Sequence, residues 1–199
     1  MPLISLLRMR NPIRLKNLSA RFLPLYVVGL WLLIFHVPSR AALLAGALPI
    51  LLGLVLRSWG AGHLVKNDAL TMTGPYAHLR HPLYLGTLLI GTGFAIAIGG
   101  LLGVVILLLL WPWFALRYFP RKESLESERL GVRYGERFAR YREAVPALWP
   151  RLAAWRDAAH PAPAEDWALD RYSDNNELGT LLAVSLCWLA FWLRAGFTA

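Results

Sequence analysis

Hydrophobic and polar residues in this chain are grouped in long blocks. Five apolar segments are separated by basic or turn-forming stretches. Each is shorter than the roughly 20 residues that a helix needs to cross a bilayer, so flanking Trp, Ser and Gly residues must extend it or the membrane must be thin there. The pattern predicts an all-α, polytopic integral membrane protein with about five transmembrane helices. The segments are Phe22–Val37, Ala41–Leu56, Leu83–Ile98, Leu101–Leu116 and Leu178–Leu193.

Glycine and proline positions predict how these helices pack and turn. The second segment and its extension carry glycines that offer a small-residue face for close packing. Gly99-Gly100 predicts a tight hairpin between the third and fourth segments, and glycines in the third would let these helices approach. Pro112 is expected to kink the fourth segment. The glycines are Gly46, Gly53, Gly60 and Gly62 in the second helix, and Gly86, Gly91 and Gly93 in the third.

The polar region after the fourth segment predicts a basic cytoplasmic helix over Arg117–Arg142. Six of its residues recur at spacings of four, four, four, four and three, so they share one continuous face. Val145-Pro146 ends the helix, Ala158–Glu165 reads as a linker, and Trp167–Glu177 is expected at headgroup level. The six residues are Lys122, Glu126, Leu130, Tyr134, Phe138 and Tyr141.

Composition supports a membrane protein. Hydrophobic residues make up 57% of the 199 residues and charged residues 17%, with a mean hydropathy of +0.45. A soluble domain usually has about 25% charged residues. The single cysteine, Cys187, excludes an internal disulfide and suits a small buried filler. We expect no zinc or iron site and no cleavable signal peptide.

The formal net charge of +9 is distributed unevenly between the two sides of the predicted membrane helices. Nineteen lysines and arginines fall in the N-terminal arm and the large polar regions, whereas only Arg40 and Arg194 fall on the opposite side. The positive-inside rule then places the N-terminus and the large polar regions in the cytoplasm and the C-terminus outside. We expect an integral protein of the bacterial inner (plasma) membrane that contacts membrane lipids and binds no nucleic acid.

One stretch, Gly74–Gly86, stands out as an island of turn formers, histidines and tyrosines between apolar regions. Gly74-Pro75 forces a turn, and Pro82 suits the first position of a helix. Arg80 and His81 then sit where a membrane helix begins, beside free backbone N–H groups that attract the negative part of a ligand. The alternative is an ordinary interfacial loop, because His, Arg and Tyr are common at membrane surfaces.

The order of residues in this stretch resembles a known signature. Gly74-Pro75-Tyr76, followed by Arg80-His81-Pro82 with Tyr84 and Gly86, resembles the motif of the isoprenylcysteine carboxyl methyltransferase and phospholipid methyltransferase superfamily. A second block, from Glu126 through Tyr134-Gly135 to Val145-Pro146, is similar to that family's C-terminal motif. The resemblance implies an integral membrane enzyme that uses S-adenosylmethionine to methylate a lipophilic or small acceptor entering from the bilayer.

The resemblance covers residues 66–150 and implies a methyltransferase core there. The whole chain, 1–199, is then one membrane domain, with a basic arm over 1–21, a cytoplasmic or interfacial linker over 151–177 and a C-terminal transmembrane helix over 178–195. The implied catalytic residues are His81 and Lys122. The implied cofactor-binding residues are Asp68, Ala69, Leu70, Thr71, Tyr76, Arg80, His81, Pro82, Leu83, Tyr84 and Glu126.

These residue types fit the parts of the implied cofactor. The helix start at His81–Leu83 suits its carboxylate, Tyr76 and Tyr84 suit the adenine, and Glu126 suits the amino group or a ribose hydroxyl. Lys122 stands where the family has an arginine that meets the acceptor. Two structural roles without a ligand stay open as alternatives: a salt bridge between Glu126 and Lys122, and a simple surface loop at residues 68–71.

Two other functions stay open at this point. Sterol and steroid reductases resemble this fold and have a similar His-Pro-Asn-Tyr element for NADPH, but Leu83 stands at the asparagine position here. A non-catalytic membrane scaffold is the other alternative, although it would not need Tyr76, His81, Tyr84 and Glu126 together. The C-terminal apolar segment also departs from compact methyltransferases, whose chains end soon after the second block.

Overall fold

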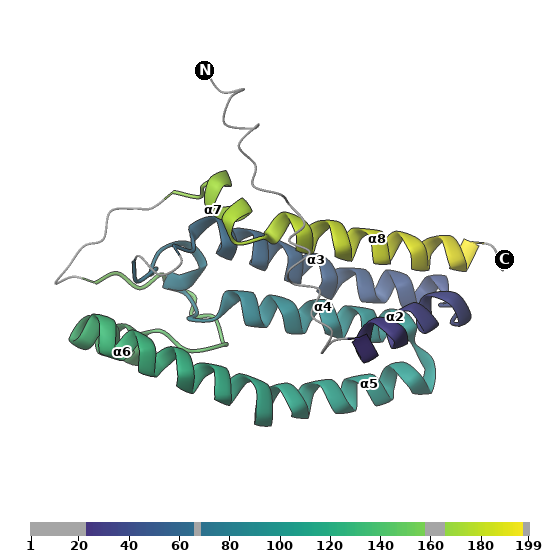
Figure 1. Ribbon diagram of the computed structural model, residues 1–199, viewed down its shortest axis with the longest axis horizontal. Helices are drawn as coiled ribbons and strands as arrows, with labels where there is room; N and C mark the ends of the chain where they lie inside the picture. The colour runs from purple at the N-terminus through teal and green to yellow at the C-terminus, as the bar shows by residue number, and fades with distance from the viewer. Residues whose placement is uncertain (1–22, 66–68, 158–165, 197–199) are drawn as a thin grey trace, which may run out of the picture.

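The computed structural model describes residues 23–65, 69–157 and 166–196. The predicted N-terminal arm, Asp68 and the Ala158–Glu165 linker lie outside these residues. The regular structure within them is helical, with no strand, which confirms the all-α class (Figure 1). The helices are α2 (Leu23–Phe35), α3 (Arg40–His63), α4 (Pro82–Ile98), α5 (Gly100–Trp113), α6 (Phe119–Ala144), α7 (Leu169–Asp174) and α8 (Glu177–Gly196).

Each of the five predicted apolar segments forms a helix, and three helices are long and apolar enough to cross a membrane. These are α3, the continuous Gly100–Ala144 helix and α8, whereas α4 is apolar but shorter. Their outward faces are apolar: Leu101 of α5 is 80% exposed and Leu108 is 67% exposed. Exposed apolar surface on helices of this length and hydropathy is typical of membrane-spanning helices. The chain is therefore a membrane protein, and the number of five spans stays a prediction.

The α3–α4 pair is the most extensive helix contact in the described chain, and glycines permit it. A Cβ atom added at Gly46 would overlap the carbonyl oxygen of Gly93, and one added at Gly53 would lie 2.6 Å from the carbonyl oxygen of Gly86. The two backbones are thus in direct contact at two levels of the antiparallel pair. The predicted small-residue face is confirmed: Gly46, Gly53 and Gly60 face α4, whereas Gly62 faces the ring of Trp167.

The predicted hairpin at Gly99-Gly100 is confirmed, because both glycines have positive φ values, +70° and +55°. The end of α5 differs from the prediction. Beyond Pro112 the chain forms a π-helical turn, Phe114–Tyr118, and continues directly into α6. Pro112 lacks the N–H for a regular helical bond but does not end the helix, and the π turn begins two residues after it. The membrane helix α5 and the polar helix α6 therefore form one long element (Figure 1).

The segment before α8 caps the end of α3. The indole N–H of Trp167 donates to the carbonyl of Ser58 at 2.9 Å, and the side-chain amide of Asn175 donates to the carbonyls of Ala61 and Leu64 at 2.8 and 3.0 Å. The last carbonyls of a helix have no partner within the helix, so the bond from Asn175 to Ala61 satisfies a group that would otherwise be unpaired, whereas Trp167 binds a carbonyl one turn further back. Trp167–Glu177 is thus attached to α3 and contains α7.

A buried ion pair joins α3 to α8 beside this cap. The guanidinium of Arg57 donates to both carboxylate oxygens of Glu177, at 2.8 and 2.7 Å. The same guanidinium donates to the hydroxyl of Thr87 on α4 at 2.6 Å. The Glu177 side chain is only 2% exposed. Three helices therefore meet at one charged pair, which fixes the C-terminal helix against the α3–α4 pair.

Two separate hydrophobic cores lie at opposite ends of the molecule. The first joins α3, α4 and α8 around Leu43, Ala97, Ile98, Phe191 and Ala195. The second packs α6 against the segment before α4 and the chain that follows α6. Its buried members are Leu70, Met72, Phe138, Tyr141 and Val145. The second core holds α6 against the segment that enters α4, and the candidate site lies in this part of the molecule.

Candidate functional site

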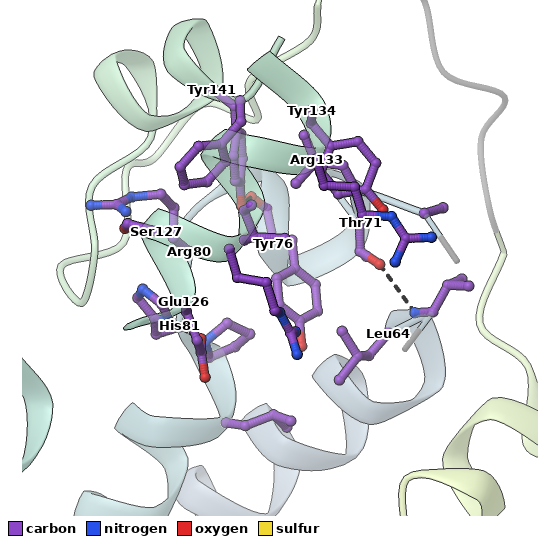
Figure 2. Close-up of a pocket in the computed structure, with 18 of the residues that line it drawn as sticks. Leu64, Thr71, Tyr76, Arg80, His81, Glu126, Ser127, Arg133, Tyr134 and Tyr141 are labelled. Atoms are coloured by element: carbon purple, nitrogen blue, oxygen red, sulfur yellow. Dashed lines mark hydrogen bonds and ion pairs between the residues drawn. The ribbon is translucent and has the colours of Figure 1, made fainter. Parts of the chain in front are cut away.

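A pocket of about 380 Å³ lies between α6 and the segment that enters α4 (Figure 2). In the view of Figure 2, Tyr76 stands between His81 and Glu126 on one side and Thr71 and Arg133 on the other. The volume is within the range of small-molecule sites, roughly 300–1,000 Å³. The lining residues are Leu64, Val65, Ala69, Leu70, Thr71, Tyr76, Arg80, His81, Pro82, Leu83, Tyr84, Glu126, Ser127, Arg129, Leu130, Arg133, Tyr134, Phe138 and Tyr141.

The structure brings most of the predicted site residues together. Ten of the eleven expected cofactor-binding residues line this single pocket, from Ala69 to Glu126. Asp68, the eleventh, lies outside the described residues. Lys122 lies on the exposed face of α6 and does not line the pocket. It is one residue away from Glu123, which has the inward position that the sequence interpretation gave to Lys122.

Local backbone chemistry explains how the segment before α4 is shaped. Gly74 has a φ of +57°, and a Cβ atom there would lie 2.5 Å from the ring of His63, so the turn requires glycine. Pro75 follows in a short 3-10 helix, Gly74–Ala77. Pro82 lies in the first turn of α4 and His81 is its N-cap, as predicted, without a capping bond from the His81 side chain.

Glu123 holds the two basic residues in front of α4. Its carboxylate accepts a hydrogen bond from Arg80 Nη1 at 2.5 Å and is in contact with Nε2 of His81. Ser127, one turn further along α6, donates to the same carboxylate at 3.3 Å. The Glu123 side chain is 16% exposed, so this cluster is largely shielded from water. Arg80 and His81 are therefore fixed by α6 and do not move freely at the helix start.

The other ring nitrogen of His81 faces a second carboxylate. His81 Nδ1 lies 3.4 Å from a carboxylate oxygen of Glu126, and the hydroxyl of Tyr84 donates to the other Glu126 oxygen. The rings of His81 and Tyr84 are stacked with centroids 5.4 Å apart. Burial alone would lower the pKa of His81, but the hydrogen bonds to Glu123 and Glu126 raise it above its ordinary value. The two carboxylates thus favour the protonated imidazole.

Tyrosines from α6, from α4 and from the 3-10 turn line the pocket. The hydroxyl of Tyr141 donates to the backbone carbonyl of Tyr76 at 2.8 Å, which ties α6 to the 3-10 turn. Burial raises the pKa of Tyr76 well above its usual range, so its hydroxyl stays protonated. The tyrosines therefore offer flat faces and no negative charge to a ligand, while the hydroxyls of Tyr84 and Tyr141 already donate within the protein.

Sequence reasoning missed Glu123, Ser127, Arg129 and Arg133. The signal was available, because Glu123 lies three residues before Glu126 and four before Ser127, which is helical spacing. The expected face ran through Lys122, and its other five members do line the pocket: Glu126, Leu130, Tyr134, Phe138 and Tyr141. Gly135, whose φ of +50° and ψ of −127° are not helical, bends α6 between Tyr134 and Phe138. The inward face continues across this bend, and Lys122 is the one member of the predicted row that lies outside it.

The donor set of this pocket does not favour a metal cation. Among the residues that the structure describes, no group of three or more His, Cys, Asp or Glu side chains is arranged to hold one. The nearest arrangement is His81 with Glu123 and Glu126, but both ring nitrogens face carboxylates and Glu123 also binds Arg80. Arg129 and Arg133 add positive charge to the lining. The arrangement suits a small molecule that carries an anionic group and a flat apolar part.

Comparison with known proteins gives two curated relatives. The chain is 36% identical over 120 residues to the cobalt-zinc-cadmium resistance protein CzcN of Cupriavidus metallidurans, a match that covers 59% of this chain and 53% of CzcN. It is 33% identical over 120 residues to the nickel-cobalt-cadmium resistance protein NccN of Alcaligenes xylosoxydans xylosoxydans, which covers 59% of this chain and 54% of NccN. The match thus spans about half the length of these relatives. No protein-family model and no solved structure matches the chain.

These relatives correct the functional interpretation of the sequence. The predicted membership in the methyltransferase superfamily is wrong, because the curated relatives are metal-resistance proteins and no family model matches. The predicted S-adenosylmethionine-dependent methyl transfer is contradicted with it, and neither the reductase nor the scaffold alternative is supported. The residues of the motif, among them His81 and Glu126, do line one pocket, but the motif did not identify the protein's function. What the comparisons do support is a bacterial membrane protein similar to metal-resistance proteins.

Proposed function

We propose that this chain is a membrane protein that supports bacterial resistance to divalent heavy-metal cations. The observation that carries the proposal is its similarity to two proteins whose names refer to cobalt, cadmium, zinc and nickel resistance. The match covers 59% of 199 residues, about 117, so at most 199 − 117 = 82 residues lie outside it. Wherever it begins, it includes residues 83–117, which form nearly all of α4 and all of α5. The similarity therefore involves the membrane helices next to the pocket.

In this proposal the pocket binds a small anionic organic ligand and does not bind the metal cation itself. Arg80 is paired with Glu123, and Arg129 and Arg133 line the pocket against the carboxylate of Glu126, so the lining carries an excess of positive charge that repels a free divalent cation. The protein would then contribute to resistance through a bound metabolite or lipid-derived molecule. That S-adenosylmethionine binds in this pocket stays a prediction, because no comparison tests which ligand the pocket takes.

Cells that lack this gene are expected to become more sensitive to cobalt, zinc or cadmium, and the wild-type gene should restore tolerance. Glu123→Gln should restore little, because it removes the carboxylate that holds Arg80 and His81 in the pocket. Glu128→Gln is the matched control, since Glu128 is an exposed carboxylate on the same helix. Growth across a metal series measures both. Unchanged tolerance in the deleted cells would refute the role in resistance.

The ligand part of the proposal has its own measurement. Calorimetry of the purified protein with zinc and cobalt salts is expected to give no tight binding. Tight zinc binding that disappears in His81→Ala would show that the pocket is a metal site and would contradict the proposed anionic ligand. The same titration with S-adenosylmethionine checks that prediction directly.

Orientation in the membrane follows from charge. We propose five spans in the bacterial inner membrane with the N-terminus and the pocket in the cytoplasm, since nineteen of the 21 basic residues lie on that side. A reporter fused after Ala199 should then be active only outside the cytoplasm, and one inserted in the Ala158–Glu165 linker only inside it. A cytoplasmic signal from the C-terminal fusion would contradict the fifth span.

A further inference from the structure

The chain that follows α6 exposes two large apolar side chains. Trp149 is 80% exposed and Leu152 is fully exposed, although both lie on a loop and not on a lipid-facing helix. Large apolar side chains at such exposure on one short loop indicate a surface that contacts a membrane or another protein. We call residues 145–157 the α6 loop.

Backbone hydrogen bonds fix the position of this loop. The N–H groups of Arg80 and His81 donate to the carbonyls of Pro146 and Ala147, at 2.9 and 3.1 Å. The N–H of Arg151 donates to the carbonyl of residue 78 at 3.0 Å. Both ends of the 146–151 tip are therefore attached to the residues immediately before α4. In Figure 1 the chain returns from the far end of α6 to the start of α4.

That position is the level at which the membrane helices begin. The apolar helix α4 starts at Pro82, next to the attachment points. Trp59, near the end of α3, connects the loop to the same level of the helices. The centre of its ring lies 6.0 Å from that of His78, and the ring of His78 is hydrogen-bonded to the carbonyl of Arg151 at 2.8 Å. Tryptophans prefer the membrane–water boundary. Trp59 on α3 and Trp149 on the loop therefore belong to the same region of the molecule.

The exposed charge of the loop is positive. Arg151 and Arg156 are its basic residues, and its one acid, Asp157, is only 8% exposed and faces arginines of α6. Apolar side chains flanked by arginines are typical of segments that lie on anionic lipid. We propose that the α6 loop inserts Trp149 and Leu152 into the headgroup region of an anionic lipid surface, the leaflet that surrounds the helices.

The lipid contact would also hold the edge of the pocket. The carbonyl of Val145, at the start of the loop, accepts a hydrogen bond from Arg80 Nε at 2.9 Å. A loop attached to the membrane thus supports the arginine that binds Glu123. This inference needs only the geometry of the loop and does not depend on the proposed role in metal resistance.

Site-directed fluorescence tests the lipid contact. Cys187 is the only cysteine in the sequence, so Cys187→Ala provides a background in which Leu152→Cys carries one environment-sensitive dye. The full chain is reconstituted in vesicles of phosphatidylcholine and phosphatidylglycerol. We expect blue-shifted emission that is quenched by lipids brominated near the headgroup end of the acyl chain. The shift should be smaller in vesicles of phosphatidylcholine alone and in Arg156→Glu.

Val132→Cys is the matched control. Val132 is 88% exposed, but it lies 14 residues beyond Tyr118 on α6, about 21 Å at 1.5 Å per residue. Tyr118 packs against Tyr84 of α4, so this distance is measured from the level of the membrane helices. Dye at Val132 should be quenched by aqueous iodide and not by brominated lipid.

Two results would overturn the proposal. Iodide quenching at position 152 equal to that at position 132 would show a loop in water. Shielding from iodide without any quenching by brominated lipid would show that a protein surface, such as a second copy, covers the loop. Unchanged elution of both labelled proteins on gel filtration establishes that the substitutions leave the fold intact, as expected for exposed positions.

Discussion

Replacing Glu177 with alanine is expected to destabilise the protein by about 3–5 kcal/mol, the usual consequence of leaving one partner of a buried ion pair alone. The carboxylate of Glu177 binds Arg57 through two hydrogen bonds, and its side chain is 2% exposed. Without it, the guanidinium keeps only neutral partners: the hydroxyls of Thr87 and Thr180 and a backbone carbonyl of α4. Thermal unfolding of the purified protein in detergent should show a midpoint several degrees lower.

A double substitution separates charge burial from simple loss of packing. Arg57→Met together with Glu177→Leu removes both charges and keeps apolar volume, so most of the lost stability should return. Asp170→Ala is the control for removing an acid nearby, because Asp170 is exposed on α7 and should change stability by no more than about 0.5 kcal/mol. An unchanged midpoint in Glu177→Ala alone would show that the ion pair does not hold α8 against α3.

Substitution of Gly46 by valine is expected to separate α3 from α4. Even a single Cβ atom at Gly46 would overlap the carbonyl oxygen of Gly93, a backbone atom that cannot rotate away, and would lie 3.0 Å from Ala97. Overpacking of this kind costs about 1–3 kcal/mol. Gly53→Val should act in the same way against Gly86. Both glycines lie in the same α3–α4 contact, so the double variant should lose less than the sum of the two single losses.

Gly29→Val is the matched control for these glycines. Gly29 lies in α2, where nothing is within 4 Å of an added Cβ atom. The same chemical change should therefore leave the unfolding midpoint unchanged or raise it, because glycine within a helix costs roughly 0.5–1 kcal/mol relative to alanine. Folded yield and thermal midpoint measure all three variants. Equal losses at Gly29 and Gly46 would mean that the close α3–α4 contact is not the cause.

The helices were predicted from local patterns, and the patterns were sufficient for them. An apolar run has to be helical in a bilayer because its backbone groups find no water there. Pro82 and the Gly99-Gly100 pair set the two ends of α4, since each acts through its own backbone. The expected extension of the second segment through Gly60 and Gly62 is confirmed, since α3 ends at His63. Hydrogen bonds from Asn175 and Arg171 to the carbonyls of Ala61 and Gly62 satisfy groups at that end.

The candidate site was predicted in part. Tyr76, Arg80, His81 and Tyr84 were identified from one contiguous stretch, and they line one pocket. Glu123 was not, because its importance comes from hydrogen bonds to residues more than forty positions earlier. The functional interpretation failed at a different step. A short motif indicates how residues are arranged around the start of a helix, and proteins with different functions can share that arrangement.

The sequence by itself determined the membrane helices, their ends and the turn that opens α4, because each depends on residues within a few positions of one another. Only the tertiary structure decided the pairings between distant segments. Arg57 meets Glu177 across 120 residues, and α6 presents Glu123 to His81 across 42. Such pairs depend on how whole helices rotate and pack. The glycine contacts fix α3 against α4, and the core around Leu70, Phe138 and Val145 fixes α6 against the segment before α4. Hydrophobic periodicity along one helix does not encode such packing between distant segments.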